Sequence, residues 1–170
     1  MPTLEKLSLP PPFEEAMKSL QSEIMRFIAR STRDREDSLD LFQETWLRAY
    51  RAYPTLRSPS GLRPWVFSIA ANLCRNRARD RMRRARVIVN DGRDADTEAE
   101  RFFPHAQSSP DGVIGLRRAL AALPGKQGKA LMMRKFGGLE YAEIATELKC
   151  SQESARASVY QALKKLKASQ

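Results

Sequence analysis

Arginine is the residue type in this sequence that is best placed to do chemistry. Twelve consecutive positions contain seven arginines: Arg75, Arg77, Arg79, Arg81, Arg83, Arg84 and Arg86. A guanidinium donates two parallel hydrogen bonds to a phosphate, so this cluster suits the backbone of a nucleic acid. A helix surface that only faces water would normally interleave glutamates with its basic residues, and this run holds a single acid, Asp80. We therefore favour nucleic-acid binding over a solvated surface.

One long helix is expected to carry these arginines. Residues 65–86 begin with an apolar stripe at spacings that fit one face of a helix. The stripe consists of Val66, Ile69, Ala70, Leu73 and Cys74. Pro64 suits the first turn, where the N–H that proline lacks would have no partner in any case. The helix is thus predicted to be anchored in a core at its start and basic at its end, with a net charge of +6.

The charge of the whole chain is strongly positive and unevenly distributed. Its 170 residues carry a formal net charge of +10, and the pI is about 10.1. Residues 1–64 are almost neutral, residues 87–112 carry a net charge of −4, and residues 113–170 carry +7. Two basic blocks separated by an acidic one predict two nucleic-acid contact surfaces joined by a linker.

The residue inventory argues against a metalloprotein or an enzyme. Two cysteines, Cys74 and Cys150, and one histidine, His105, are too few for a zinc site, and a disulfide between the cysteines is not expected. No carboxylate cluster or nucleophile with a base stands out, so we expect no catalytic residues, metal or cofactor. No apolar run approaches ~18 residues and no signal-peptide pattern is present, which predicts a cytoplasmic protein without membrane insertion.

The first half of the chain is predicted to fold as a three-helix domain. Residues 1–12 end in three prolines and are expected to form a flexible arm. Apolar residues at helical spacing predict helices over residues 13–30 and 36–53. Residues 54–64 are rich in proline, serine and glycine, which indicates a loop before the basic helix. We assign residues 13–86 to this N-terminal domain.

The second half is predicted to be a separate helical domain. Residues 87–112 combine acids, small polar residues and prolines with few apolar anchors, a composition typical of a flexible linker. Residues 113–170 contain four helical segments punctuated by proline, glycine and serine. Their bounds are 113–123, 126–136, 141–148 and 152–167. The expected fold class is all-α, with a three-helix N-terminal domain and a four-helix C-terminal domain.

The last two segments have the spacing of a helix-turn-helix. Only three residues separate them, and Ser151 is a plausible N-cap for the second helix. That second helix is basic at its end and is the one that enters a major groove in such motifs. Its outward side chains are Gln152, Glu153, Arg156, Ala157, Tyr160 and Lys164.

These segments resemble a known family, the extracytoplasmic-function sigma factors of bacteria. Asp37 and residues 40–51 (DLFQETWLRAYR) are similar to the second conserved region of that family, and residues 62–73 (LRPWVFSIAANL) are similar to its promoter-melting segment. Region four of the family resembles the C-terminal segments. The matching residues there are 120–124 (LAALP), Gln127, Gly138, Leu139, Tyr141, Glu143, Ile144, Ala145 and Leu163. The resemblance covers about residues 14–86 and 113–167, in the family's order.

The resemblance implies a non-enzymatic subunit that binds core RNA polymerase, through its beta and beta-prime subunits, and directs it to promoter DNA. The polymerase-binding residues would be Asp40, Gln43, Glu44, Leu47 and Arg48. The −10 element would be contacted by Arg57, Ser58, Ser60, Arg63, Trp65, Asn72, Arg75 and Arg79. The −35 element would be contacted by the outward residues of the second helix in the helix-turn-helix. An anti-sigma factor is expected as a further partner.

Three positions depart from the pattern of the family. Lys149 replaces the glycine that is common in the turn of the helix-turn-helix, so this turn is expected to be strained or differently shaped. Ser158 replaces a common arginine on the recognition helix, and Leu39 replaces a common acid on the polymerase-binding helix.

Three other classes of protein are compatible with parts of the sequence. A conventional helix-turn-helix regulator would bind DNA without joining the polymerase, and residues 1–86 would then serve dimerisation or sensing. An enzyme that acts on nucleic acid would need a catalytic cluster that is not recognisable here. An RNA-binding adaptor is disfavoured by the scarcity of aromatic residues in the basic helix.

Overall fold

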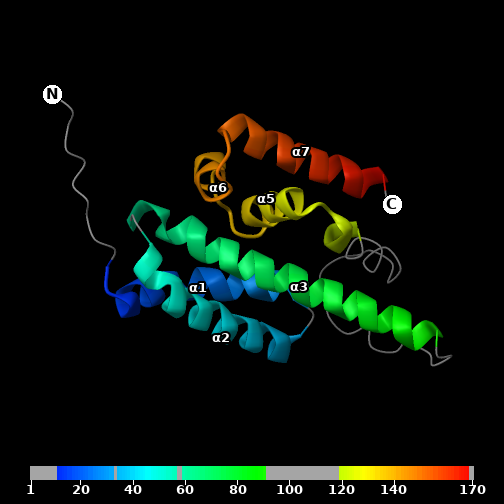
Figure 1. The fold of residues 1–170 in the computed structure, drawn as a ribbon, viewed down its shortest axis with the longest axis horizontal. Coiled ribbons are helices and arrows are strands. Elements are labelled where there is room, and N and C mark those ends of the chain that lie inside the picture. The colour runs from blue at the N-terminus through cyan, green and yellow to red at the C-terminus, as the bar shows by residue number, and fades with distance from the viewer. Residues whose placement is uncertain (1–10, 33, 57–58, 91–118, 169–170) are drawn as a thin grey trace.

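The computed structural model is built from helices that lie on both sides of one long helix, α3 (Figure 1). It describes residues 11–32, 34–56, 59–90 and 119–168, and only the backbone of Ser60 and of residues 87–90. The helices are α1 (Phe13–Ser31), α2 (Arg35–Ala52), η1 (Tyr53–Thr55), η2 (Pro59–Gly61), α3 (Leu62–Asn90), α5 (Gly125–Lys135), α6 (Tyr141–Glu147) and α7 (Gln152–Ala168). Residues 119–122 form a further helical turn. All regular elements of the described residues are helical, which confirms the predicted fold class.

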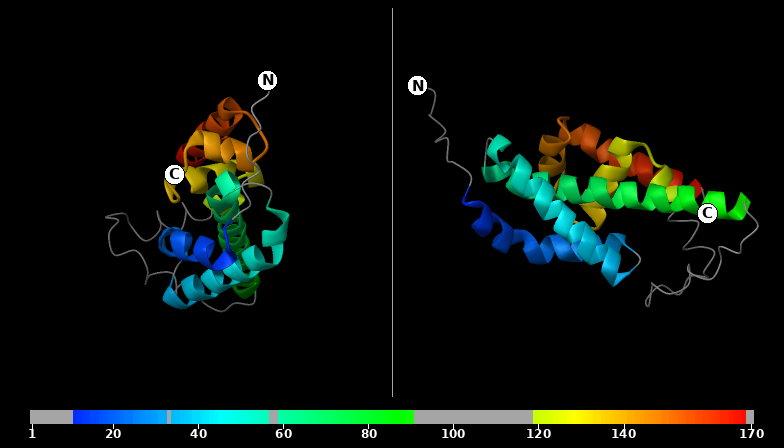
Figure 2. Two further views of the ribbon diagram at one scale, coloured as in Figure 1. Left: turned by 90° about the vertical axis from the view of Figure 1, so that its left-hand side faces the viewer. Right: turned by 60° about the horizontal axis from the view of Figure 1, so that its bottom comes forward.

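The long helix separates two groups of helices. In the views of Figure 1 and Figure 2, α1 and α2 lie on one side of α3, and α5 and α6 lie on the other. Helix α7 packs on α5 and α6. The predicted basic helix therefore packs against both halves of the molecule.

The N-terminal group packs as the apolar spacing of its sequence predicts. Helix α1 buries Ile24, Phe27 and Ile28, and α2 buries Leu41 and Trp46. The Phe27 ring meets the ring of Phe67 on α3 edge to face, with 5.2 Å between centroids. Aromatic pairs of this geometry stabilise a core beyond the area that they bury.

The same core continues into the C-terminal group. Met133 on α5, Leu139 and Ile144 are fully buried and belong to one cluster with the buried residues of α1 and α3. Gly137 lies so close to α3 that a Cβ added there would come within 2.9 Å of the Phe67 ring. The two halves of the chain are thus packed directly against each other.

The helix-turn-helix has the predicted cap and a turn in a left-handed conformation. The Ser151 hydroxyl accepts a hydrogen bond from the Ser154 N–H at 3.1 Å, as expected for an N-cap. Lys149 has a φ of 50°, the one positive φ of a non-glycine residue in the described part of the chain. The conformation that glycine usually supplies is therefore kept here by a lysine.

Both ends of α3 differ from the expectation. The helix begins at Leu62, within the predicted loop of residues 54–64, and it also extends further at its C-terminal end. Helix α3 runs to Asn90, so residues 87–90, which the sequence places at the start of the acidic linker, continue the helix. The rest of that linker and the N-terminal arm up to residue 10 lie outside the described residues.

Candidate nucleic-acid interface

The seven arginines of residues 75–86 on α3 fall into four groups according to their contacts. Arg77 and Arg81 face α2, whereas Arg75 and Arg79 face the C-terminal half. Arg83 pairs along the helix with Asp80 at 3.2 Å, and both side chains are exposed. The remaining two, Arg84 and Arg86, are exposed and contact no other described residue through hydrogen bonds or ion pairs. The cluster is therefore not a uniform surface.

The arginines that face α2 share a buried carboxylate. Asp37 is only 7% exposed, and its side chain accepts hydrogen bonds from Arg77, at 2.7 Å, and from Arg81. Arg81 also donates to Asp34, the N-cap residue of α2, at 3.2 Å. Two charges of the basic run thus hold α3 on the beginning of α2.

The arginines that face the C-terminal half bind backbone carbonyls. Arg75 is buried and donates to the carbonyl oxygens of Leu123, at 2.7 Å, and Leu120, at 3.4 Å. Arg79 donates to the Ala121 carbonyl at 3.2 Å. Burial lowers the pKa of Arg75, and the charge of Arg79 lowers it further. Arg75 and Arg79, two of the residues predicted to contact the −10 element, are therefore hydrogen-bonded to the C-terminal half of the chain.

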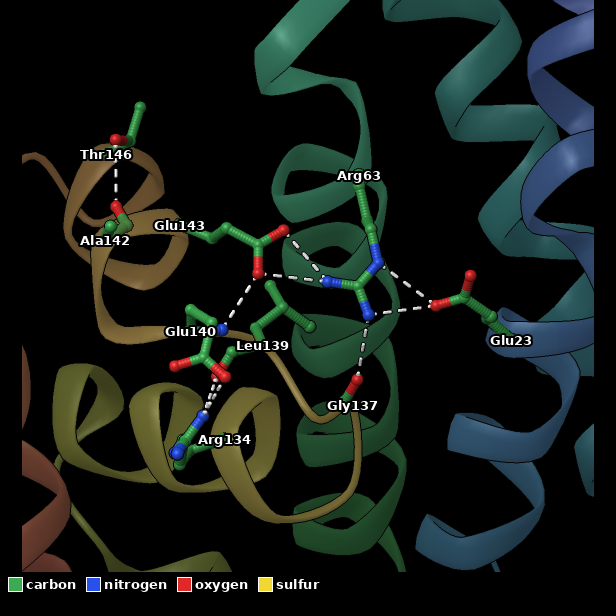
Figure 3. A network of polar contacts seen from close by, with 9 residues as sticks. All are labelled: Glu23, Arg63, Arg134, Gly137, Leu139, Glu140, Ala142, Glu143 and Thr146. Carbon is green, nitrogen blue, oxygen red and sulfur yellow. Dashed lines mark hydrogen bonds and ion pairs between the residues drawn. The ribbon is translucent and has the colours of Figure 1, made fainter.

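Arg63, near the start of α3, joins the two halves through ion pairs (Figure 3). Its guanidinium donates to Glu143 on α6 at 2.9 Å and to Glu23 on α1 at 3.0 Å. It also reaches the Gly137 carbonyl at 3.4 Å. Burial is the largest single influence on the pKa of Arg63 and lowers it. The hydrogen bonds and charges of Glu143 and Glu23 together outweigh burial, so the pKa of Arg63 is raised.

The other predicted −10 residues are placed differently from one another. Asn72 is exposed on α3, whereas Trp65 is half-buried and its ring lies 6.3 Å from that of Tyr53. Ser60 belongs to η2, and Arg57 and Ser58 lie outside the described residues. The structure brings Arg63, Arg75 and Arg79 onto the side of α3 that the C-terminal half covers.

The predicted polymerase-binding residues lie together on the outward face of α2. Asp40, Gln43, Leu47 and Arg48 are exposed and Glu44 is half-buried, all on α2. They form one wall of a shallow groove. Its opposite wall is formed by Leu73, Asn76, Arg77 and Asp80 of α3. This groove is accessible while Arg75 and Arg79 are covered.

The predicted −35 residues are all exposed on α7. These residues are Gln152, Glu153, Arg156, Ala157, Tyr160 and Lys164. The Arg156 guanidinium lies 5.2 Å from the centre of the Tyr141 ring on α6, within the range of a cation–π contact. The outward face of α7 is therefore exposed, and Arg156 on this face contacts the Tyr141 ring.

Two titratable groups lie at the junction of the halves. Burial raises the pKa of Glu147, while a hydrogen bond from Ser68 and the charges of Lys129 and Lys149 oppose that rise. Burial lowers the pKa of Lys129, while the charge of Glu147 opposes that shift. Each group therefore favours its neutral form in this packing more than it would in water.

Sequence reasoning missed the residues that bind the arginines of α3. Glu23, Asp37 and Glu143 carry no distinguishing motif for such pairing, although Asp37 and Glu143 are among the residues that resemble the family. Gly128, in the middle of α5, is a usable signal because glycine weakens a helix unless something needs the space. A Cβ there would lie 1.5 Å from the Arg75 Nη1 atom.

The described residues contain no helix with the length and apolarity needed to cross a bilayer. Within the same residues, no group of three or more histidine, cysteine or acidic side chains is arranged to hold a metal ion.

A basic helix and a helix-turn-helix in one chain are typical of a DNA-binding protein. The family model for sigma-70 region 2 matches residues 16–84, and the model for sigma-70 region 4 matches residues 115–166. The chain is 30% identical to the ECF RNA polymerase sigma-E factor of Escherichia coli, over 74% of this chain and 70% of that one. It is 29% identical to the RNA polymerase sigma-H factor of Pseudomonas aeruginosa, over 88% and 81%.

Solved structures share the fold. The sigma factor RpoE of Bartonella quintana, in complex with the anti-sigma factor NepR, matches with a TM-score of 0.57 and 20% identity, over 92% of this chain and 95% of that one. CnrH, in complex with the cytosolic domain of CnrY, matches with a TM-score of 0.55 and 16% identity, over 92% and 85%. The chain belongs to the sigma-70 family of RNA polymerase sigma factors, in its extracytoplasmic-function group.

Proposed function

We propose that this protein is the promoter-recognition subunit of RNA polymerase, with residues 13–86 and 113–170 as its two DNA-contacting domains. It binds core polymerase, selects the −35 and −10 elements and assists melting. The proposal rests above all on the order of its parts. A region 2 match that contains the basic helix precedes a region 4 match that contains the helix-turn-helix. Its chemistry is binding alone, so it needs no cofactor and acts in the cytoplasm with the polymerase.

Each surface receives one role in this proposal. The exposed face of α2 docks on the polymerase, where its groove with α3 receives a helical partner segment. The start of α3 and the loop before it bind the −10 element, and the exposed side of α7 enters the major groove of the −35 element. Because relatives of this fold occur in complexes with anti-sigma factors, we include such a protein among the partners.

The alternative of a conventional helix-turn-helix regulator is not favoured. Both halves of the chain match sigma-70 regions, and a free-standing regulator has no need of the region 2 module. The two readings differ in one observable property, since a regulator binds its operator without core polymerase. A sigma factor changes where the polymerase starts.

Run-off transcription with purified core polymerase and a genomic promoter library tests the proposal. The protein should direct new start sites, and Leu47→Asp on the exposed face of α2 should abolish them by blocking docking. Lys18→Asp, at an exposed position of α1, is the matched control and should behave as the wild type. Failure of the wild-type protein to join core polymerase, or joining without a change of start sites, would contradict the proposal.

A further inference from the structure

The first part of α7 carries a single positive charge, that of Arg156. It is the one cation among residues 152–163, and the lysines of this helix begin at Lys164. In helix-turn-helix motifs the N-terminal residues of the second helix are the ones that contact base edges. Ser158 adds no positive charge there, and its hydroxyl donates a hydrogen bond back to the Ser154 carbonyl at 2.8 Å. The placement of one guanidinium therefore decides how this part of the helix presents positive charge to DNA.

The Arg156 guanidinium contacts the aromatic ring of Tyr141. Its Cζ atom lies 5.2 Å from the centre of that ring, while the side chain as a whole is exposed and makes no hydrogen bond or ion pair with a described residue. A free arginine samples many rotamers and loses that freedom when it binds. A ring that holds the guanidinium beforehand removes part of this cost. A cation–π contact uses no N–H donor, so all five donors remain for DNA.

The backbone that carries the Tyr141 ring is itself held in place. Tyr141 is the first residue of α6 and follows the N-cap residue Glu140. Glu140 and Glu143 form a capping box, in which the Glu140 N–H donates to the Glu143 carboxylate at 2.8 Å. A capping box fixes the first turn of a helix. The half-buried ring thus starts from a backbone position that does not depend on Arg156.

A second guanidinium, that of Arg134 on α5, lies over the same ring. Its Cζ atom is 4.9 Å from the ring centre. Arg134 donates hydrogen bonds to the Leu139 carbonyl at 2.8 Å and to the Glu140 carboxylate at 3.0 Å. The hydrogen bond to Glu140 is the main reason that the pKa of Arg134 is raised. The negative charge of Glu140 also lessens the repulsion between two cations that share one ring.

We propose that Tyr141 is a positioning residue for −35 recognition, whose ring holds the Arg156 guanidinium in the conformation that meets the DNA. This inference rests on the −35 role proposed above for α7. The contact joins all three helices of the module, since α5 supplies Arg134, α6 supplies Tyr141 and α7 supplies Arg156. The charge that α7 presents therefore depends on how the helix-turn-helix is packed, and not on the sequence of α7 alone.

The dependence of transcription on the −35 element measures this role. Core polymerase with the full-length protein transcribes a promoter found by the run-off assay, in one version with its −35 element intact and in another with that element replaced. Arg156→Ala should lower the ratio of the two transcripts at least about fivefold, the lower end of the discrimination that a well-placed arginine provides. Tyr141→Leu should lower the same ratio about two- to fivefold, the range of a cation–π contact at an exposed site.

Two comparisons separate positioning from a general defect of the module. Tyr141→Phe is the matched control, because it keeps the ring and should match the wild type. In an Arg156→Ala background, Tyr141→Leu should add nothing, since no guanidinium is left to position. An unchanged ratio in Tyr141→Leu, equal defects in the leucine and phenylalanine variants, or an added defect in the Arg156→Ala background would each overturn the proposal.

The NMR resonance of the Arg156 Nε–H reports the contact before DNA binds. An aromatic ring shifts the resonances of protons over its face upfield. The resonance, assigned by its loss in Arg156→Lys, should lie upfield in the wild type and in Tyr141→Phe, and should return to the position of an exposed arginine in Tyr141→Leu. The same position in the wild type and in Tyr141→Leu would mean that the ring does not hold Arg156, which overturns the proposal.

A further variant covers the case in which Tyr141→Leu does not fold. If circular dichroism shows this, Tyr141→Met takes its place in both measurements, because methionine fills irregular space without a ring. The results also separate this proposal from the proposed function. Failure of the wild-type protein to direct new start sites contradicts the sigma-factor role. A ratio that responds to Arg156→Ala and not to Tyr141→Leu contradicts only the positioning role.

Discussion

Helices α3 and α7 are both basic and receive similar roles, yet they differ in how much of their charge is available. All six residues proposed for the −35 element are exposed on α7. On α3, Arg63 and Arg79 are half-buried and Arg75 is buried, and all three bind the C-terminal half. Composition therefore identifies both helices as candidates for phosphate binding. Packing decides which of their side chains are exposed to a phosphate in this structure.

The cause is the position of each helix in the fold. Helix α3 is a wall of two packed groups, so its side chains meet α1 and α2 on one side and α5 and α6 on the other. The buried residues of α7 are Ala155, Val159, Ala162 and Leu166, which lie along one side of the helix. A helix with one buried stripe keeps the rest of its circumference for a partner. A helix that packs on two sides, as α3 does, leaves less of its circumference exposed.

The largest expected effect on stability comes from truncating Phe67, the α3 side chain that packs against both halves. Phe67→Ala removes a ring that is 1% exposed and that contacts both Phe27 and the region of Gly137. We expect a loss of about 3–5 kcal/mol in the free energy of unfolding, measured by urea denaturation. Tyr160→Ala on α7, where the side chain is 67% exposed, should change it by less than about 0.5 kcal/mol. Similar losses at both sites would contradict the contrast between the helices.

A smaller effect is expected at Asp37, the buried carboxylate that binds Arg77 and Arg81 of α3. Asp37→Ala leaves Arg77 and Arg81 without their shared acceptor, and we expect a loss of about 1–3 kcal/mol in the free energy of unfolding. Glu44→Ala is the control, because its pair with Arg48 is exposed and such pairs contribute about 0.3–0.5 kcal/mol. A loss at Asp37 no larger than at Glu44 would show that this carboxylate does not anchor α3.

The sequence predicts the helices well because their apolar spacing is local. The stripes in residues 13–30 and the N-cap at Ser151 follow from neighbours a few positions apart, and the structure has both. The covering of α3 depends on pairs such as Arg63 with Glu143, which lie 80 residues apart. No periodicity records such a pair. The proposed site residues on α3 could thus be selected by residue type and spacing. Their hydrogen bonds to the C-terminal half could not be predicted in this way.

The salt dependence of DNA binding distinguishes the arginines that bind phosphate from those that hold the fold. Arg86 is exposed and without a described partner, so Arg86→Ala should reduce the slope of log affinity against log salt by about 1 for the holoenzyme. Arg77→Ala should change the slope much less, because that guanidinium is committed to Asp37. Equal changes would mean that the Asp37 pair opens when DNA binds, which would extend the contact surface along α3.

The smallest expected effect lies in the turn that leads into α7. Lys149 holds a φ of 50°, where a side chain with a Cβ is disfavoured by roughly 1–2 kcal/mol. Glycine relieves this strain but loses more conformational freedom on folding, so Lys149→Gly should stabilise the protein by at most about 1 kcal/mol. Gly138 supplies the matched reverse change: its φ is 65° and a Cβ there meets no atom within 4 Å, so Gly138→Ala should destabilise by backbone strain alone. Opposite shifts in melting temperature would assign the effect to the left-handed backbone. A loss of stability in Lys149→Gly would instead mean that the lysine side chain contributes contacts that outweigh its strain.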